Sequence, residues 1–177
     1  ERYADYKIQR PAMPDDLRSQ MDLIHAAVDG YRLGVMEVAG YEADDLIAVA
    51  ARTFAEQGVN VVIISDDKDL FQLVGNHVRV YSPRKEEILD EDGVERALGV
   101  RPERVADFLG LAGDSSDNIP GVQGIGKVTA HKLIQQFGSL EDIYDSLDQI
   151  VSKSVREKIA SQKEQAFLSR ELVRLRS

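Results

Sequence analysis

Residues 59–70 read VNVVIISDDKDL, and this stretch gives the clearest indication of the fold class. Its first half is apolar and rich in β-branched side chains, which is typical of a buried strand in a parallel sheet. The run ends in three acids, Asp66, Asp67 and Asp69. Ligands of open α/β sheets bind beyond the carboxyl ends of the strands, so these acids lie where a functional site is expected.

The segments around this strand alternate between helical and strand patterns. Residues 15–29 and 40–58 have helical spacing, residues 34–38 are a strand candidate, and a short strand is expected near residues 78–81. This order predicts a βαβ unit and an α/β fold, with a mostly parallel sheet flanked by helices. Beyond Pro102 the pattern is entirely helical.

Composition excludes several classes of protein. The 177 residues include no cysteine, which excludes disulfides and thiolate metal sites and is compatible with a reducing cytoplasm. There is no apolar run of bilayer-spanning length, so we expect no membrane partner. With only three histidines, any metal must be held mainly by oxygen, which favours Mg²⁺ or Mn²⁺.

The net charge of −9 taken alone argues against a nucleic-acid partner. The charge is unevenly distributed, however, because residues 151–177 carry seven basic and three acidic side chains. An acidic body with a basic end suits a metal-dependent enzyme whose carboxylates are neutralised by cations. An ordinary acidic surface is the alternative.

Three acidic clusters lie at boundaries between the expected elements. They are Glu42, Asp44 and Asp45; Asp66, Asp67 and Asp69; and Asp114 with Asp117. Each cluster alone has an ordinary interpretation, since acids favour helix starts and aspartate is a common turn residue. Together they suit two Mg²⁺ ions about 4 Å apart, which activate a water and stabilise the leaving oxygen of a phosphodiester.

Glycines at 121, 124 and 126 precede another helical stripe. Small residues at a helix start expose backbone amides, which is an anion-binding arrangement. A hairpin between two helices would hold a DNA phosphate in this way without reading sequence, and Lys127 and Lys132 would add charge. The alternative is a plain turn, which would not need three glycines.

The motifs YKIQR, GYEADD, DKDLFQLV, GDSSDNIPGVQGIGKVTAHKL and FGSLEDI occur in an order that resembles the 5′ nuclease family. This family contains flap endonucleases and the 5′→3′ exonuclease domain of bacterial DNA polymerase I. The resemblance covers nearly the whole chain and implies a structure-specific 5′→3′ exonuclease or flap endonuclease of replication and repair. It implies two-metal hydrolysis of DNA carrying a 5′ flap, nick or 5′ end, beside or fused to a polymerase, in a bacterial cytoplasm. We expect a monomer.

The resemblance also implies roles for individual residues. It places metal ions on Glu42, Asp44, Asp45, Asp67, Asp69, Asp114 and Asp117. The catalytic residues that it implies are Lys7, Arg10 and Asp67, of which the first two also contact DNA near the scissile phosphate. It places the DNA-binding hairpin, which often holds K⁺ in the family, on Gly121, Gly124, Ile125, Gly126 and Lys127, with Lys132 beside it.

The resemblance divides the chain into three parts. Residues 1–110 are the α/β core, residues 111–150 the helix–three-turn–helix region, and residues 151–177 a helical segment of the same domain. Asp66 departs from the family, which usually has a small residue there. The family's first strand and two upstream aspartates are absent, so we expect a fragment truncated at both ends. A DNA-binding fragment that cannot cut is therefore the alternative; the glycine hairpin argues against a third reading, an RNA-cleaving relative.

Overall fold

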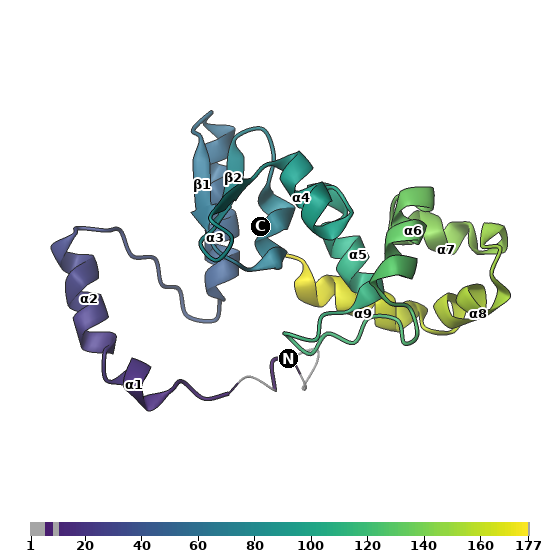
Figure 1. Ribbon diagram of the computed structural model, residues 1–177, viewed down its shortest axis with the longest axis horizontal. Helices are drawn as coiled ribbons and strands as arrows, with labels where there is room; N and C mark the ends of the chain where they lie inside the picture. Colours follow the sequence, from purple (N-terminus) through teal and green to yellow (C-terminus); the bar gives the residue numbers. More distant parts are fainter. Residues whose placement is uncertain (1–5, 9–10, 177) are drawn as a thin grey trace.

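The computed structural model describes residues 6–8 and 11–176 and has an α/β part followed by helices (Figure 1). Within this described part, one sheet runs in the order β1 (Val61–Ile64), β2 (Val78–Ser82) and β3 (Glu87–Leu89). β1 and β2 are parallel, whereas β2 and β3 are antiparallel. The α/β class is confirmed. The sheet is small and mixed, because a tight turn after β2 returns the chain at once as β3.

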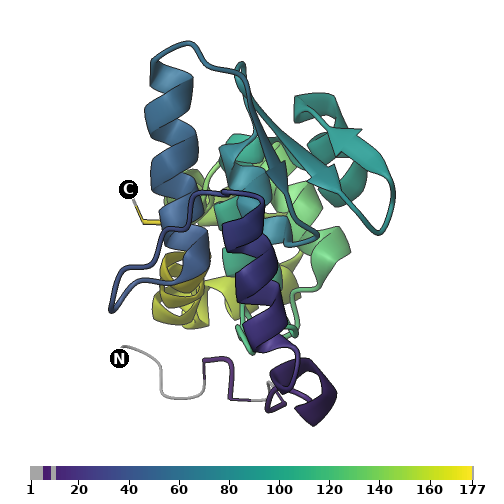
Figure 2. The same cartoon turned by 90° about the vertical axis from the view of Figure 1, so that its left-hand side faces the viewer.

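Among the described residues, three helices precede the sheet: α1 (Asp15–Arg18), α2 (Met21–Gly30) and α3 (Ala43–Glu56). The sequence predicts one helix over residues 15–29, but the chain turns between α1 and α2. Neither of these two helices contains a buried residue. Both lie in an arch that stands away from the body of the molecule, whereas α3 runs beside the sheet (Figures 1 and 2).

The strand predicted over residues 34–38 is wrong. These residues have no regular structure and lie in the arch, where Val35 and Met36 are 71% and 58% exposed. A short strand needs a neighbour that accepts its backbone hydrogen bonds, and no described strand pairs with this segment. The parallel pair β1–β2 is instead connected through a short 3₁₀ helix, η1 (Lys68–Leu73).

The rest of the chain is helical, as the sequence predicts. Its elements are α4 (Glu91–Leu98), η2 (Pro102–Arg104), α5 (Val105–Ala112), α6 (Lys127–Phe137), α7 (Leu140–Asp145), η3 (Leu147–Gln149), α8 (Lys153–Ser161) and α9 (Lys163–Val173). The predicted cap of α7 is confirmed, since the Ser139 side chain accepts a hydrogen bond from the Asp142 amide.

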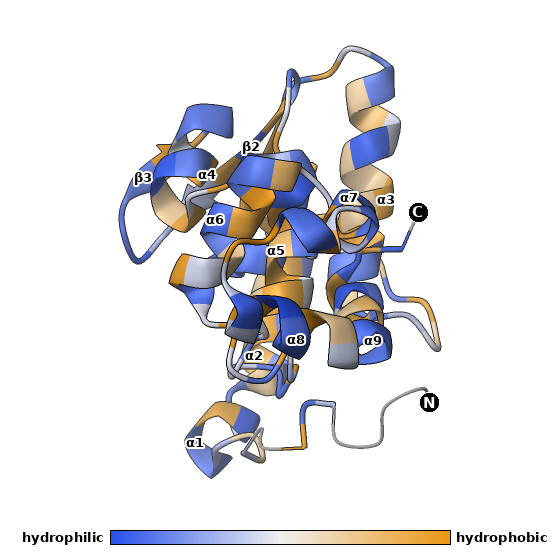
Figure 3. Cartoon of the chain, turned by 90° about the vertical axis from the view of Figure 1, so that its right-hand side faces the viewer, coloured by the Kyte–Doolittle hydropathy of each residue, from blue (hydrophilic) through white to orange (hydrophobic). Residues whose placement is uncertain are grey.

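Helix α5 is the centre of the core. Phe108, Leu109 and Leu111 are buried on it, and its apolar residues face the interior of the helical region (Figure 3). Helix α9 packs closely against it at Gly110, where an added Cβ would lie 2.9 Å from the Cβ of Arg170. Because α5 also contacts η1, the sheet and the helical region share one core.

Candidate metal centre

Local hydrogen bonds hold two acids at the carboxyl end of β1. Asp67 caps η1, and its Oδ1 accepts from the Asp69 amide at 3.0 Å. The Asp67 amide in turn donates to the Ser65 hydroxyl at 3.0 Å. These hydrogen bonds fix the conformation of the SDDKD turn, residues 65–69, whose carboxylates lie at the carboxyl end of β1.

Asp69 is the most unusual of these acids. Its side chain is nearly covered, with the residue only 7% exposed, and among the described residues no donor reaches its Oδ1. The pKa of Asp69 is raised to about 7, mainly by burial; the negative charges of Asp67, Asp114 and Asp117 also raise it, whereas the positive charge of Lys68 lowers it. A buried oxygen without a partner is costly, so this carboxylate is suited to a ligand that neutralises it.

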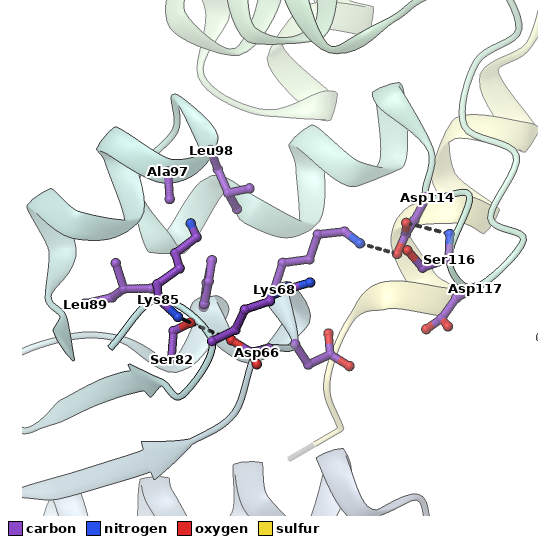
Figure 4. Close-up of a pocket in the computed structure, with 13 residues that line it drawn as sticks. Asp66, Lys68, Ser82, Lys85, Leu89, Ala97, Leu98, Asp114, Ser116 and Asp117 are labelled. Atoms are coloured by element: carbon purple, nitrogen blue, oxygen red, sulfur yellow. Dashed lines mark hydrogen bonds and ion pairs between the residues drawn. The ribbon is translucent and has the colours of Figure 1, made fainter. Parts of the chain in front are cut away.

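The loop after α5 brings the third cluster to the second. Asp114 and Ile119 exchange backbone hydrogen bonds of 2.8 and 2.7 Å, which close the loop. Asp114 accepts from the Ser116 amide at 3.0 Å and pairs with Lys68 Nζ at 2.6 Å (Figure 4). Burial alone would raise the pKa of Asp114, but the hydrogen bonds from Lys68 and Ser116 outweigh it, so the pKa is lowered.

The start of the arch connects the first cluster to the third. Glu42, the residue before α3, pairs with Lys7 Nζ at 2.6 Å. The Lys7 amide donates to the carbonyl of Asp117 at 3.1 Å. Burial lowers the pKa of Lys7, but its hydrogen bonds to Glu42 and Tyr6 outweigh this effect, and the pKa is raised. Lys7 thus connects two acidic clusters. Its contact with DNA near the scissile phosphate, which the family resemblance implies, stays a prediction.

The remaining predicted site residues are placed differently. Asp44 and Asp45 lie in the first turn of α3, and Asp45 Oδ1 accepts from the Arg176 amide at 3.0 Å. Arg10 lies outside the described residues. Among residues 6–8 and 11–176, no three acidic or histidine side chains come close enough together to form a metal site. The metal-ligand roles therefore stay predictions.

The donor set nevertheless fits a hard divalent cation. It consists of oxygens alone, and it includes the buried Asp69 Oδ1 that no protein donor satisfies. The ammonium groups of Lys7 and Lys68 supply the positive charge that the carboxylates require. An ion would take over that compensation and release both lysines.

Asp66 lies apart from this group. It accepts a short hydrogen bond from the Ser82 hydroxyl, at the end of β2. The same hydroxyl accepts from the Lys85 amide at 3.3 Å. Asp66 therefore points towards the β2–β3 turn, and Figure 4 shows it beside Ser82 and Lys85.

The glycine hairpin joins α5 to α6, and its glycines have different structural tasks. Gly121 has φ +60°, and a Cβ there would lie 2.3 Å from the amide nitrogen of Gly113. Its own amide donates to the buried Ser169 hydroxyl at 3.1 Å, and Ile125 is a core residue. Gly121 and Ile125 thus stabilise the hairpin through its buried side.

The outer side of the hairpin is exposed at Gly124 and Gly126. Gly124 has φ +81°, and an added Cβ there would lie 2.8 Å from Lys158 Nζ, whereas Gly126, the residue before α6, has nothing within 4 Å of an added Cβ. In the part of the chain that the structure describes, the amides of Gly124, Gly126 and Lys127 donate no hydrogen bond. Lys127 and Lys132 are exposed on α6. Open amides at the start of a helix are suited to an anion.

Three residues of the site were not singled out from the sequence. Lys68, which lies between Asp67 and Asp69 in the sequence, connects the second cluster to the third through its ion pair with Asp114. Tyr6 hydrogen-bonds Glu42 at 3.4 Å, and its place beside Lys7 is the only signal for it. Ser169 is fully buried behind the hairpin, 48 residues from Gly121, and no local pattern indicates that contact.

Two family models match the chain. The 5′-3′ exonuclease N-terminal resolvase-like domain matches residues 1–99, and the 5′-3′ exonuclease C-terminal SAM fold matches residues 100–177. The predicted divisions after residues 110 and 150 stay predictions.

Several curated proteins are similar to the chain. It is 43% identical to DNA polymerase I of Pseudomonas aeruginosa over its whole length, which is 20% of that protein. It is 44% identical to the thermostable DNA polymerase I of Thermus thermophilus, of which it covers 21%. The 5′-3′ exonuclease of Aquifex aeolicus is 40% identical over 98% of the chain and 58% of that protein. The chain thus spans about a fifth to three fifths of these relatives.

Solved structures share the fold. A pseudo-enzyme–product complex of the bacteriophage T5 flap endonuclease with DNA and metal ions matches with a TM-score of 0.83 and 24% identity, over 98% of this chain and 68% of that one. A T5 5′-exonuclease with bound divalent zinc matches with a TM-score of 0.80 and 24% identity, over 97% and 68%. The catalytic core of Rad2 in complex with a DNA substrate is more distant, with a TM-score of 0.53 and 19% identity over 94% and 57%.

Proposed function

We propose, from the premise that the chain belongs to the 5′-3′ exonuclease family, that it forms the catalytic centre of a divalent-metal-dependent 5′ nuclease acting on DNA. The observation that carries this proposal is the buried, unpartnered Oδ1 of Asp69. It lies within the electrostatic reach of three further carboxylates, Asp67, Asp114 and Asp117. These neighbouring negative charges and burial disfavour the ionised form of Asp69, and a cation among the acids would offset that cost.

Mg²⁺ is the cation that we propose, with Mn²⁺ as a substitute, because both prefer oxygen ligands. Asp67, Asp69, Asp114 and Asp117 would hold it, and α3 would contribute from Glu42, Asp44 and Asp45. Two such ions, when bound, supply an activated water and stabilise the charge on the leaving oxygen of the phosphodiester.

The lysines at the site orient the phosphate. Lys7 and Lys68 now pair with Glu42 and Asp114, and both become available when cations take over these carboxylates. Charge-assisted hydrogen bonds from ammonium groups to phosphate oxygens are strong, and they fix the position of the reacting group. Arg10 is expected to act with them.

The hairpin holds the duplex next to the cut. The amides of Gly124, Gly126 and Lys127 point out at the start of α6, and they suit a backbone phosphate irrespective of the sequence. A K⁺ ion at the hairpin is part of the proposal, supported by the Gly124 carbonyl, which already faces the ammonium of Lys158 at 3.4 Å. The substrate is then DNA with a 5′ end, nick or flap.

The similarity to polymerases suggests the setting of the reaction. Two of the relatives named above are DNA polymerases I. We infer a monomeric nuclease that acts with a polymerase, or as part of one, in the bacterial cytoplasm. The described residues include no helix that could cross a membrane.

Cleavage of a 5′-labelled flap, with Mg²⁺ or with chelator, tests the proposal. Asp67→Asn should cut at least about a hundredfold more slowly than the parent, because a cation at the reacting phosphate supplies several kcal/mol of charge stabilisation. Asp92→Asn, an equal loss of charge on an exposed residue of α4, is the control and should cut normally. A parent that binds the flap with Mg²⁺ present but leaves it uncut would replace this proposal by the DNA-binding alternative.

A further inference from the structure

The tip of the glycine hairpin is held by side chains from a later part of the chain. Val122 and Ile125 are buried on either side of the tip, so only Gln123 and Gly124 project from the core. Among the described residues, no backbone group forms a hydrogen bond with either Gln123 or Gly124. The conformation of the tip therefore depends on its contacts with side chains.

Gln162, the residue between α8 and α9, makes the contacts with Gln123. Its Oε1 accepts from the Gln123 amide at 2.8 Å, and its Nε2 donates to the Gln123 carbonyl at 3.2 Å. The side-chain amide thus bonds both main-chain groups of one residue, as the opposite residue of an antiparallel strand does. The same Nε2 donates to the carbonyl of Lys158 at 3.2 Å, which fixes Gln162 to the last turn of α8.

Lys158 covers the second residue of the tip. An added Cβ at Gly124 would lie 2.8 Å from Lys158 Nζ and 3.1 Å from its Cε, and Nζ donates to the Gly124 carbonyl at 3.4 Å. Lys158 and Gln162 are four residues apart, a spacing that places side chains on one face of a helix. The end of α8 is therefore the support on which the tip rests, and α6 and α8 lie at the same end of the molecule (Figure 1).

We infer that Gln162 is a positioning residue for the binding of duplex DNA. It holds the tip in the conformation that leaves the amides of Gly124 and Gly126 open to a phosphate. This inference rests on the proposed function, and it adds a residue 39 positions beyond Gln123 that acts through the hairpin rather than by touching DNA. A tip that is already ordered loses little backbone entropy when the phosphate binds.

Fluorescence anisotropy of a labelled duplex, in chelator so that it is not cut, measures the effect. Gln162→Met removes the hydrogen bonds at similar side-chain size, and should weaken binding about tenfold, because roughly one residue of backbone must then be fixed on binding. The variant loses no charge, so the log–log salt slope should equal that of the parent. Gln136→Met makes the same change at an exposed residue in the last turn of α6; it is the control and should bind normally.

Two further measurements separate positioning from a loss of stability. Amide hydrogen exchange at Gln123 should become faster in Gln162→Met and not in Gln136→Met. Cleavage of a flap in Mg²⁺ should show a KM about tenfold higher and a kcat within about twofold of the parent's, because the acids are untouched. Gln162→Asn, one methylene shorter, should act like Gln162→Met, and it replaces that variant if thermal melts show it unfolded.

The outcomes distinguish this inference from the proposed function. The inference is wrong if the folded Gln162 variants bind the duplex like the parent, if Gln136→Met weakens binding as much, or if the salt slope falls with the affinity. A lower kcat at unchanged KM would also overturn it, since that indicates general destabilisation. If the parent binds the duplex but leaves the flap uncut, the nuclease proposal fails and the binding measurements still decide about Gln162. If the parent does not bind the duplex, the proposed duplex contact fails, and the positioning role fails with it.

Discussion

The buried Oδ1 of Asp69 indicates what kind of ligand the acidic site suits. Its Oδ1 is buried without a partner, although the neighbouring Asp67 and Asp114 are both hydrogen-bonded. In a metal-free protein this arrangement favours the protonated form of Asp69, because a proton removes the buried charge. The carboxyl is therefore a source of instability whose size depends on pH.

Metal-free stability should fall as the pH rises from about 4 to about 7. The pKa of Asp69 lies at about 7 in the folded protein, above its ordinary value of 3.8, so the folded state holds this proton more tightly than the unfolded chain. The stabilisation is complete below the unfolded pKa and is lost as the pH passes the folded one. Asp69→Asn should remove this dependence and stabilise the metal-free protein at pH 8 by roughly 2 kcal/mol.

Thermal melts in chelator at several pH values measure this effect. Asp92→Asn, at an exposed carboxylate, is the matched control and should melt with the parent's pH profile. If Asp69→Asn and the parent have parallel profiles, the buried carboxyl is not the titrating group.

Gly121 tests a second claim at the scale of one residue. A Cβ there would meet Gly113 N at 2.3 Å and Leu111 O at 2.7 Å, at φ +60°. Since both contacts are backbone, Gly121→Ala should cost about 3 kcal/mol or more. Gly126→Ala has free space and a φ of −88°, and should change the free energy of unfolding by less than about 1 kcal/mol. Urea denaturation compares the two; equal stabilities would contradict the close packing.

At the scale of helices and strands, the sequence predicts those elements that are determined by a local pattern of residues. The β-branched run 59–65 contains β1, and the capping pattern at Ser139 starts α7. β3 could not be predicted, because its three residues lie in a polar segment and are a strand only by pairing with β2. The strand predicted over residues 34–38 does not form, for the converse reason: these residues have a strand pattern, but no described strand pairs with them.

The same distinction between local pattern and long-range contact applies to the residues of the candidate site. The acids beyond β1 and the α5–α6 hairpin could be predicted, because strand ends and glycines indicate them directly. The direction of Asp66 could not, because it depends on Ser82, 16 residues away. Nor could the contact of Asp45 with Arg176, which depends on packing across the whole chain.

The hairpin and the start of α6 form one element in the proposed binding of DNA. Lys127→Ala should weaken binding of every duplex sequence and lower the log–log salt slope by about 0.9, the value for one phosphate of a duplex. Lys153→Ala on α8, where Lys153 is exposed and faces Glu157, is the matched control and should leave the slope unchanged. Anisotropy across a salt series measures both. Equal slopes for the parent and Lys127→Ala would exclude this lysine from the phosphate contact.

At the scale of the whole molecule, α5 joins the two halves of the fold, because it packs against α9 within the helical region and against η1 beside the sheet. Gly110→Ala would place a methyl group 2.9 Å from the Cβ of Arg170 and 3.1 Å from the Ala166 carbonyl. Moving a packed helix should cost about 2–3 kcal/mol, and should lower one common melting transition rather than a separate step for either half. Gly34→Ala, in the open arch, should be close to neutral. Calorimetry with two resolved transitions would show that the halves are independent.

The last described residues of the chain contact two elements from its first half, α3 and η1, the 3₁₀ helix that follows β1. Gln72 donates to the carbonyl of Val173, Arg52 to that of Arg176, and the Arg176 amide to Asp45; these contacts join residues 101, 124 and 131 positions apart. During synthesis, α3 and η1 leave the ribosome long before these partners exist. Since chains grow at about 5–20 residues per second, this half must wait several seconds with its contact surface uncovered. The packing of α3 at Asp45, in the first acidic cluster, is thus completed only after residue 176 has been synthesised.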